Sequence, residues 1–159
     1  MALDEIDSRI LAALQHEGRL SNKELAARVG LSPSACLSRV RRLESDGTIR
    51  GYGANVDPRA LGIRLMALVA VRLTGHSPAA LQGLSDSLQA RPEVVAIYYV
   101  SGADDFLVHI AARDSDHLRD LLPTLFTARH EVSHVQTALI FDHVRSGVLP
   151  DYSEGALNR

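Results

Sequence analysis

Two predicted helices follow each other near the start of the chain, with only a two-residue turn between them. Ser21 and Glu24 have the spacing of a capping box at the start of the first of these helices. Gly30 can adopt the left-handed backbone conformation that ends it. Ser32 then caps the next helix, and Pro33 takes the first helical position, where a missing N–H costs nothing. Two short helices joined by so tight a turn predict a helix-turn-helix.

A further helix is predicted before this pair. Asp4 is a candidate N-cap, and apolar residues repeat at helical spacing until Gly18. The apolar stripe consists of Ile6, Ile10, Leu11 and Leu14. After Gly47, the segment from Thr48 to Val56 alternates weakly and predicts a short wing or connecting strand. Residues 1–50 are therefore expected to form a winged helix-turn-helix domain.

The helix between Ser32 and Gly47 has two unlike sides when its residues are spaced at about 100°. Its apolar side consists of Cys36, Leu37, Val40 and Leu43. Its polar side consists of Ser34, Ser38, Arg41, Arg42 and Ser45. The second helix of a helix-turn-helix enters the DNA major groove, where small side chains allow close approach and arginines bind phosphate or guanine. We therefore predict that double-stranded DNA is a partner.

The candidate DNA-binding residues are Ser32, Ser34, Ser38, Arg39, Arg41 and Arg42. The segment from Arg28 to Arg50 holds five arginines and two acidic residues, a local charge of +3, although the whole chain carries −2. A local basic patch fits contact with phosphates. The alternative is that the arginines form a solvated face on an ordinary three-helix unit.

The second half of the chain predicts the order β-α-β-β-α-β, which is the ferredoxin-like arrangement. The expected strands are Arg64–Leu73, Val94–Val100, Phe106–Ala112 and Val132–Val144, and the expected helices begin near Ser77 and Asp114. Pro123 is expected to kink or end the second of these helices. The fold class is thus α+β, with a linker at residues 51–62, a sheet domain at 63–145 and a polar tail at 146–159.

Several of these strands are apolar at successive positions, which predicts that both faces of the sheet are covered. Helices cover one face, and a partner subunit is the simplest cover for the other. Val69, Val71, Val135 and Leu139 are taken as members of such strands. The chain is therefore expected to be at least a dimer. A lipid or cofactor in that space is the alternative.

Composition excludes several other classes of protein. The longest apolar runs are far shorter than the roughly 20 residues of a membrane helix, and the N-terminus is acidic where a signal peptide is basic. A soluble, cytoplasmic protein without membrane contact is expected.

One cysteine, Cys36, allows no cysteine cluster for a metal. His134 and His143 would lie about 30 Å apart on one strand at ~3.3 Å per residue and could not share a metal. The sequence also has no nucleophile or phosphate-loop motif, so neither an enzyme nor a resident cofactor or metal is predicted.

From Leu3 to about Val144, the chain resembles the Lrp/AsnC, or feast/famine, transcription factors. The resemblance rests on LDEIDSRILAALQHEGRLSNKELAARVGLSPSACLSRVRRLESDGTIRGY and on YVSGADDFLVHI. It implies a winged helix-turn-helix followed by an effector-binding and oligomerisation domain, paired sheet to sheet as a homodimer and assembled further into higher even oligomers such as octamers. It also implies a small effector, usually an amino acid, bound between subunits.

The resemblance further implies an effector-binding loop made of Ser101, Gly102, Ala103, Asp104 and Asp105. Gly102 would let backbone N–H groups approach a ligand carboxylate, and Asp105 would accept from its ammonium group. Family members usually have an acidic residue and then an aromatic where Ala103 and Asp104 stand here. The alternatives are that the loop is only a hairpin turn, or that the protein is a metal-responsive or ligand-independent architectural regulator of the same fold.

Overall fold

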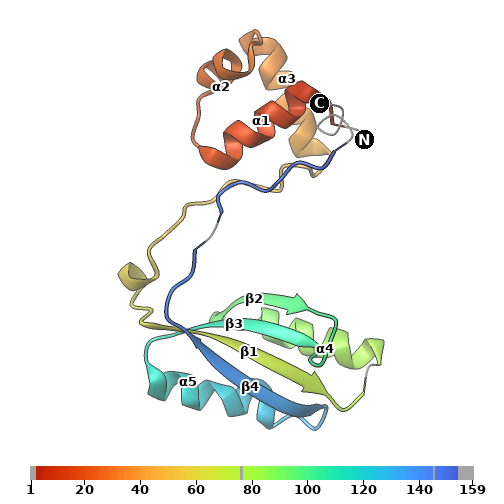
Figure 1. Ribbon diagram of the computed structural model, residues 1–159, viewed down its shortest axis with the longest axis vertical. Coiled ribbons are helices and arrows are strands. Elements are labelled where there is room, and N and C mark those ends of the chain that lie inside the picture. The colour runs from red at the N-terminus through yellow and green to blue at the C-terminus, as the bar shows by residue number, and fades with distance from the viewer. Residues whose placement is uncertain (1–2, 76, 145, 154–159) are drawn as a thin grey trace. The chain divides into compact units, whose positions relative to one another are not determined.

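The computed structural model describes residues 3–75, 77–144 and 146–153. The chain forms two compact units (Figure 1). One comprises Met1–Asn55 together with Val144–Arg159, and the other comprises Val56–His143. Each unit has its own hydrophobic core.

The first unit consists of three helices, α1 (Glu5–His16), α2 (Asn22–Val29) and α3 (Pro33–Ser45). The predicted caps are confirmed, because the side chains of Asp4, Ser21 and Ser32 each accept a hydrogen bond from a backbone N–H of the first turn. Gly30 has φ +75°, the left-handed conformation expected at the end of α2. The core of this unit consists of Ile10, Leu25, Ala26, Val29, Cys36 and Leu43. The free cysteine is thus a buried core residue.

The strand expected after Gly47 is not formed within the chain. None of the described residues from Thr48 to Val56 belongs to a strand. An extended segment becomes a strand only when its backbone groups pair with a neighbour, and this chain offers it none there. The segment is held by side chains instead, since the Tyr52 hydroxyl donates to Glu44 Oε1 at 3.0 Å.

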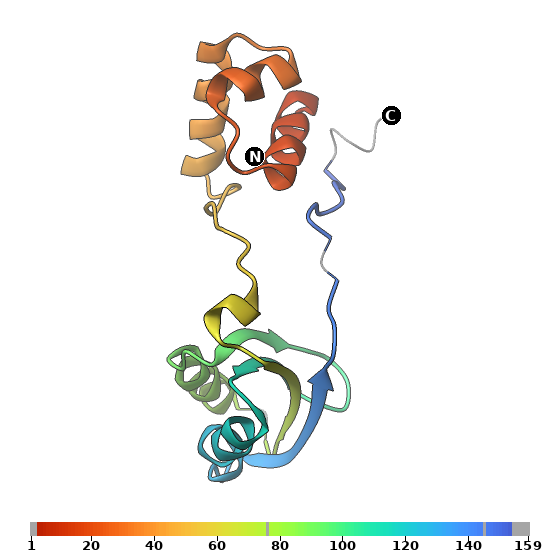
Figure 2. The ribbon, with the colours of Figure 1, turned by 90° about the vertical axis from the view of Figure 1, so that its left-hand side faces the viewer.

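The second unit has the predicted β-α-β-β-α-β order. Its elements are β1 (Leu65–Leu73), α4 (Pro78–Gln89), β2 (Val94–Tyr99), β3 (Phe106–Ala112), α5 (Ser115–Leu122) and β4 (Val132–Ile140). The strands form one antiparallel sheet in the order β2-β3-β1-β4. Both helices cover the same face of that sheet (Figure 2). This unit is therefore the predicted ferredoxin-like domain.

Two details of this unit differ from the sequence-based expectation. The last strand ends at Ile140 instead of Val144, because Ile140 pairs with Met66 near the start of β1 and the chain beyond has no strand beside it. A 3₁₀ turn, Pro58–Leu61, also interrupts the expected linker. The expectation for Pro123 is confirmed, since α5 ends at Leu122 and the chain continues as a π-helical turn, Pro123–Thr127.

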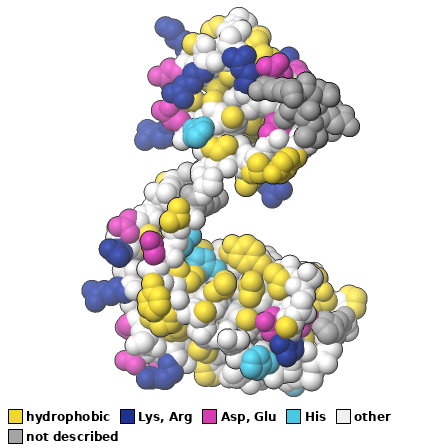
Figure 3. Space-filling view, viewed as in Figure 1, with side chains coloured by type: hydrophobic (Ala, Val, Ile, Leu, Met, Phe, Trp, Pro, Cys, Tyr) yellow, Lys and Arg dark blue, Asp and Glu magenta, His cyan; other side chains and the backbone are white. Residues whose placement is uncertain are grey.

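The structure shows which strand residues lie on each face of the sheet. Val69 and Val71 are fully buried under the helices, and Val135 and Leu139 pair with residues of that same face. We call the opposite face, which no helix of this unit covers, the open face. Leu68 lies on it and pairs with His109 of β3 and Ala138 of β4. The open face includes Met66, Leu68, Ala70, Ala96, Tyr98, Leu107, His109, Ala138 and Ile140. Figure 3 shows hydrophobic side chains gathered over this unit.

Among the described residues, no helix is both long enough and apolar enough to cross a membrane.

Candidate nucleic-acid interface and effector loop

One stripe of α3 faces solvent and carries hydroxyls followed by a cation. Ser34, Ser38 and Arg41 are all exposed, while Cys36 and Leu43 on the opposite side are buried. In the part of the chain that the structure describes, Arg41 has no hydrogen bond or ion pair. This exposed arginine is therefore available to an external anion.

The start of α3 is held in place by short polar contacts. Ser32 Oγ accepts from Ala35 N at 3.3 Å and lies 3.2 Å from Ser34 Oγ. Asn22 of α2 donates from Nδ2 to the Pro33 carbonyl at 2.8 Å, which ties the two helices together across the turn. The N-terminal turn of α3, the part that faces base edges in a helix-turn-helix, is thus presented on a fixed backbone.

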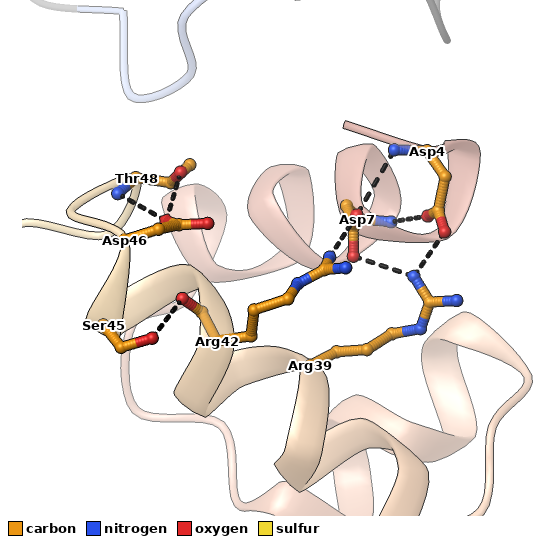
Figure 4. A network of polar contacts seen from close by, with 7 residues as sticks. All are labelled: Asp4, Asp7, Arg39, Arg42, Ser45, Asp46 and Thr48. Carbon is orange, nitrogen blue, oxygen red and sulfur yellow. Dashed lines mark hydrogen bonds and ion pairs between the residues drawn. The ribbon is translucent and has the colours of Figure 1, made fainter. Parts of the chain in front are cut away.

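Arg39 and Arg42 point away from that stripe, toward α1 (Figure 4). Arg39 Nη1 lies 2.5 Å from Asp4 Oδ2 and 2.9 Å from Asp7 Oδ1. Arg42 pairs with the second carboxylate oxygen of Asp7. The structure therefore brings two of the predicted DNA-binding arginines together in ion pairs within the unit and leaves Arg41 apart from them.

The charges of this cluster explain its arrangement. The Asp7 side chain is only 1% exposed, so its carboxylate needs cationic partners to offset the loss of water. The Arg39 guanidinium lowers the pKa of Asp4 below its ordinary value of 3.8, with a further contribution from the Asp7 backbone N–H. Asp4 and Asp7 also form the capping box of α1. One cluster thus caps α1 and fixes it to α3.

The hairpin loop between β2 and β3 holds the predicted effector residues. Gly102 has φ +127°, a conformation that favours glycine. Asp105 is buried at 7% exposure, and its carboxylate accepts from the Leu73 backbone N–H at 2.8 Å. Asp105 N also donates to the Val71 carbonyl at 2.9 Å. Asp105 thus anchors the loop to β1, and the effector-binding role that the resemblance implies for it stays a prediction.

A residue that the sequence reasoning missed lies against the same loop. Arg72 of β1 donates from Nε to the Ala103 carbonyl at 2.5 Å and from Nη2 to Asp104 Oδ1 at 3.3 Å. The Arg72 side chain is 46% exposed and that of Asp104 26% exposed. A cation and an anion therefore stand side by side at the surface of the loop, next to exposed Ser101 and Gly102. Arg72 is the polar residue in the otherwise apolar strand β1, and this contrast is the sequence feature that could have identified it as a candidate site residue.

Two family profiles match the chain along most of its length. The profile described as winged helix-turn-helix DNA-binding covers residues 3–50, and the profile described as Lrp/AsnC ligand binding domain covers residues 66–149. The chain belongs to the Lrp/AsnC family. It is a DNA-binding transcriptional regulator with a separate ligand-binding domain.

Characterised Lrp/AsnC proteins resemble it over nearly their whole length. It is 41% identical to the HTH-type transcriptional regulator AldR of Mycolicibacterium smegmatis, covering 90% of this chain and 84% of that protein. It is 37% identical to the leucine-responsive regulatory protein of Escherichia coli K12, covering 90% and 87%.

Solved Lrp/AsnC structures share its fold. An AsnC family regulator from Agrobacterium tumefaciens gives a TM-score of 0.85 at 30% identity, covering 93% of this chain and 97% of that one. A transcriptional regulator from Neisseria meningitidis, solved as a complex with L-methionine, gives a TM-score of 0.83 at 30% identity, covering 91% and 93%. The winged helix-turn-helix and ferredoxin-like domains predicted from the sequence are thus confirmed as an Lrp/AsnC architecture.

Proposed function

We propose that this regulator reads DNA with the exposed stripe of α3, dimerises through its open sheet face, and changes its DNA affinity when an amino acid binds beside the loop from Ser101 to Asp105. We also propose that it acts in the cytoplasm and is not an enzyme. Residues 51–62 are proposed as the linker, and residues 146–159 as a tail outside the sheet domain.

The observation that carries the DNA proposal is the division of the arginines on α3. Arg41 stands exposed in line with Ser34 and Ser38, whereas Arg39 and Arg42 pair with carboxylates of α1. Two small hydroxyls let the helix backbone approach base edges, and Arg41 then reaches a phosphate or a guanine. We therefore assign direct DNA contact to Ser34, Ser38 and Arg41. Ser32, Arg39 and Arg42 hold the helix in place.

The apolar open face supports the proposal of a dimer. Tyr98 is 52% exposed on that face, and Leu68 and Leu107 beside it are only partly covered. A large apolar face of this kind marks an interface with another protein, and a second copy offers the same face in a symmetric pair. Higher even oligomers, including an octamer, would then require a second and different contact between dimers.

The ion pair of Arg72 and Asp104 supports an amino-acid effector. A free amino acid carries one carboxylate and one ammonium group, so its carboxylate can pair with the cation of this ion pair and its ammonium group with the anion. Arg72 would bind the carboxylate and Asp104 the ammonium, with Gly102 allowing close approach of the backbone. Asp105, which already accepts from Leu73 N, would shape the loop. The L-methionine complex of the Neisseria relative makes methionine the first effector to test.

The test uses the full chain and a DNA duplex selected by it from a random pool. Fluorescence anisotropy would compare the wild type with a variant carrying Ser34→Ala, Ser38→Ala and Arg41→Ala, each with and without L-methionine and L-leucine. We expect the variant to lose its preference for the selected duplex while its melting temperature stays unchanged, because these side chains are exposed. A variant that still prefers the selected duplex would contradict the assignment to α3. An affinity of the wild type that neither L-methionine nor L-leucine alters would contradict the effector proposal.

A further inference from the structure

His109 of β3 is an ionisable residue on the apolar open face. It pairs with Leu68 of β1 and with Ala96 of β2, so its neighbours on both adjacent strands are apolar. Its Nε2 atom is shielded from solvent and has no hydrogen-bond partner among the described residues. Buried side-chain nitrogens in folded proteins are nearly always paired. A proton gained by this ring would therefore place a charge where the chain itself offers no partner for it.

The groups around His109 do not offset such a charge. The ring of His143, which follows β4, has its centroid 6.4 Å from that of His109. Asp142 accepts at 2.8 Å from the His143 backbone N–H and is not a cause of the pKa shift of His109. The other ionisable side chains of the strands on or beside this face are Arg64, Arg72, Tyr98 and His134. None of the residues of β1, β2, β3 and β4 is Asp or Glu.

The neutral form of His109 is already favoured in the single chain. Burial lowers the pKa of His109 below its ordinary value of 6.5, and repulsion from His143 adds to this effect. A second copy packed on the open face would remove the remaining water from the ring. In a symmetric pair that copy brings the same face, whose strands carry no carboxylate to pair with an imidazolium. Protonation of His109 is thus more unfavourable in the dimer than in the separate chains.

We infer that His109 makes the dimer sensitive to protons, because the interface accepts its neutral ring and excludes its charged form. This inference rests on the proposed dimerisation through the open face. The dimer binds fewer protons than two separate chains, so association is strongest at high pH and weakens as the pH falls through the range in which histidine titrates. Because a symmetric dimer contains His109 twice, its dissociation constant can rise by up to about a hundredfold per pH unit within that range.

Fluorescence-detected sedimentation velocity of the full chain tests this inference over nanomolar to micromolar concentrations. The dissociation constant of the dimer would be measured at several values between about pH 8 and about pH 5.5, at constant ionic strength, with circular dichroism to show that the chain stays folded. We expect a constant value above about pH 7 and a rise of at least about tenfold by pH ~5.5.

Two variants separate His109 from the other histidines. His109→Leu keeps an apolar side chain on the open face and cannot gain a proton, so its dissociation constant should not change with pH. The matched control is His134→Gln, since His134 is an exposed histidine of β4 in the same sheet. It should retain the pH dependence of the wild type.

The outcomes distinguish this inference from the proposed dimer. A wild type that is monomeric at about pH 8 would overturn the dimer itself, and the inference with it. A dissociation constant that stays the same down to pH ~5.5, or a pH dependence that His109→Leu retains, would leave the dimer standing and overturn the role of His109.

Nuclear magnetic resonance of the wild type gives a readout that needs no variant. Ring signals of labelled histidine would be followed against pH at a protein concentration high enough to keep the dimer formed. We expect His109 to gain its proton below the ordinary value of 6.5. A His109 ring that is protonated at or above that value in the dimer would overturn the inference.

Discussion

Asp7 of α1 is 1% exposed and accepts hydrogen bonds from two arginines of α3, so a carboxylate of the α1 capping box also determines how α3 is held. Arg42 donates to one of its oxygens and Arg39 to the other. Removal of this carboxylate would leave two guanidinium groups partly desolvated without their shared partner.

We predict that Asp7→Asn lowers the free energy of unfolding of the first unit by about 1–3 kcal/mol, the range for a buried polar partner that is lost. Chemical denaturation followed by circular dichroism measures it. Glu17→Gln is the matched control, because Glu17 pairs with Arg28 at the surface and such pairs contribute only about 0–1 kcal/mol. Equal effects of the two changes would contradict a structural role for Asp7.

Arg41 and Arg42 should respond differently to salt when DNA is bound. Arg41→Ala is expected to reduce the slope of log affinity against log salt by about one unit, because one phosphate contact is lost. Arg42→Ala should leave the slope nearly unchanged and lower the melting temperature instead. Anisotropy titrations at several salt concentrations, well below the melting temperature, measure the slope. If Arg42→Ala reduced the slope and Arg41→Ala did not, Arg42 would be the residue that contacts DNA phosphate.

The effector loop gives a third prediction. Asp104→Asn should weaken amino-acid binding by roughly 1.5–3 kcal/mol, the range for a hydrogen bond to a charged group. Calorimetric titration with L-methionine measures this loss, and Asp116→Asn, an exposed change on α5, serves as the control. Asp105→Asn is expected to act by another route and to lower the melting temperature even without effector, because Asp105 accepts from Leu73 N. Binding that depends on Asp105 without any loss of stability would contradict this division.

Assembly depends on the open sheet face. Leu68→Asp places a charge at the centre of that face and should convert the full chain to monomer, because an unpaired charge in an apolar interface is strongly unfavourable. Sedimentation equilibrium measures the mass. Gln82→Asp, on the solvent side of α4, should leave it unchanged. The isolated segment from Leu61 to Val144, without substitution, should remain at least dimeric. A stable dimer of the full-length Leu68→Asp variant would show that the interface lies elsewhere.

The lowered pKa of Asp4 predicts the response of the first unit to acid. The folded pKa lies below the ordinary value of 3.8, so the stabilisation is fully present above that pH and is lost as the pH falls further. Unfolding measured between neutral pH and pH ~3 should show this loss, which Asp4→Asn removes. In an Arg39→Gln background, Asp4→Asn should have little further effect, since the Arg39 guanidinium is the main cause of the shift.

The local signals of the sequence determined the helices and strands of this protein. Capping residues such as Ser21 and Ser32 satisfy backbone groups within their own turn, so no distant contact is needed to place them. Continuous apolar runs bounded by turn residues likewise located β1 and β3 to within a residue of their observed ends. A family resemblance that spans most of the chain then indicated what the two domains do.

Tertiary structure alone decided the partners of individual side chains. Arg39 and Arg41 are two positions apart in the sequence, yet the helix turns one toward Asp7 and the other toward solvent. Arg72 meets Asp104, and His109 meets His143, only because antiparallel strands bring distant parts of the chain together. The position of a single charged side chain or imidazole in the sequence does not identify the residue that it contacts. Its role depends on which residues the fold places within a few ångströms of it, as the hydrogen bond from the Leu73 backbone N–H to the Asp105 carboxylate shows.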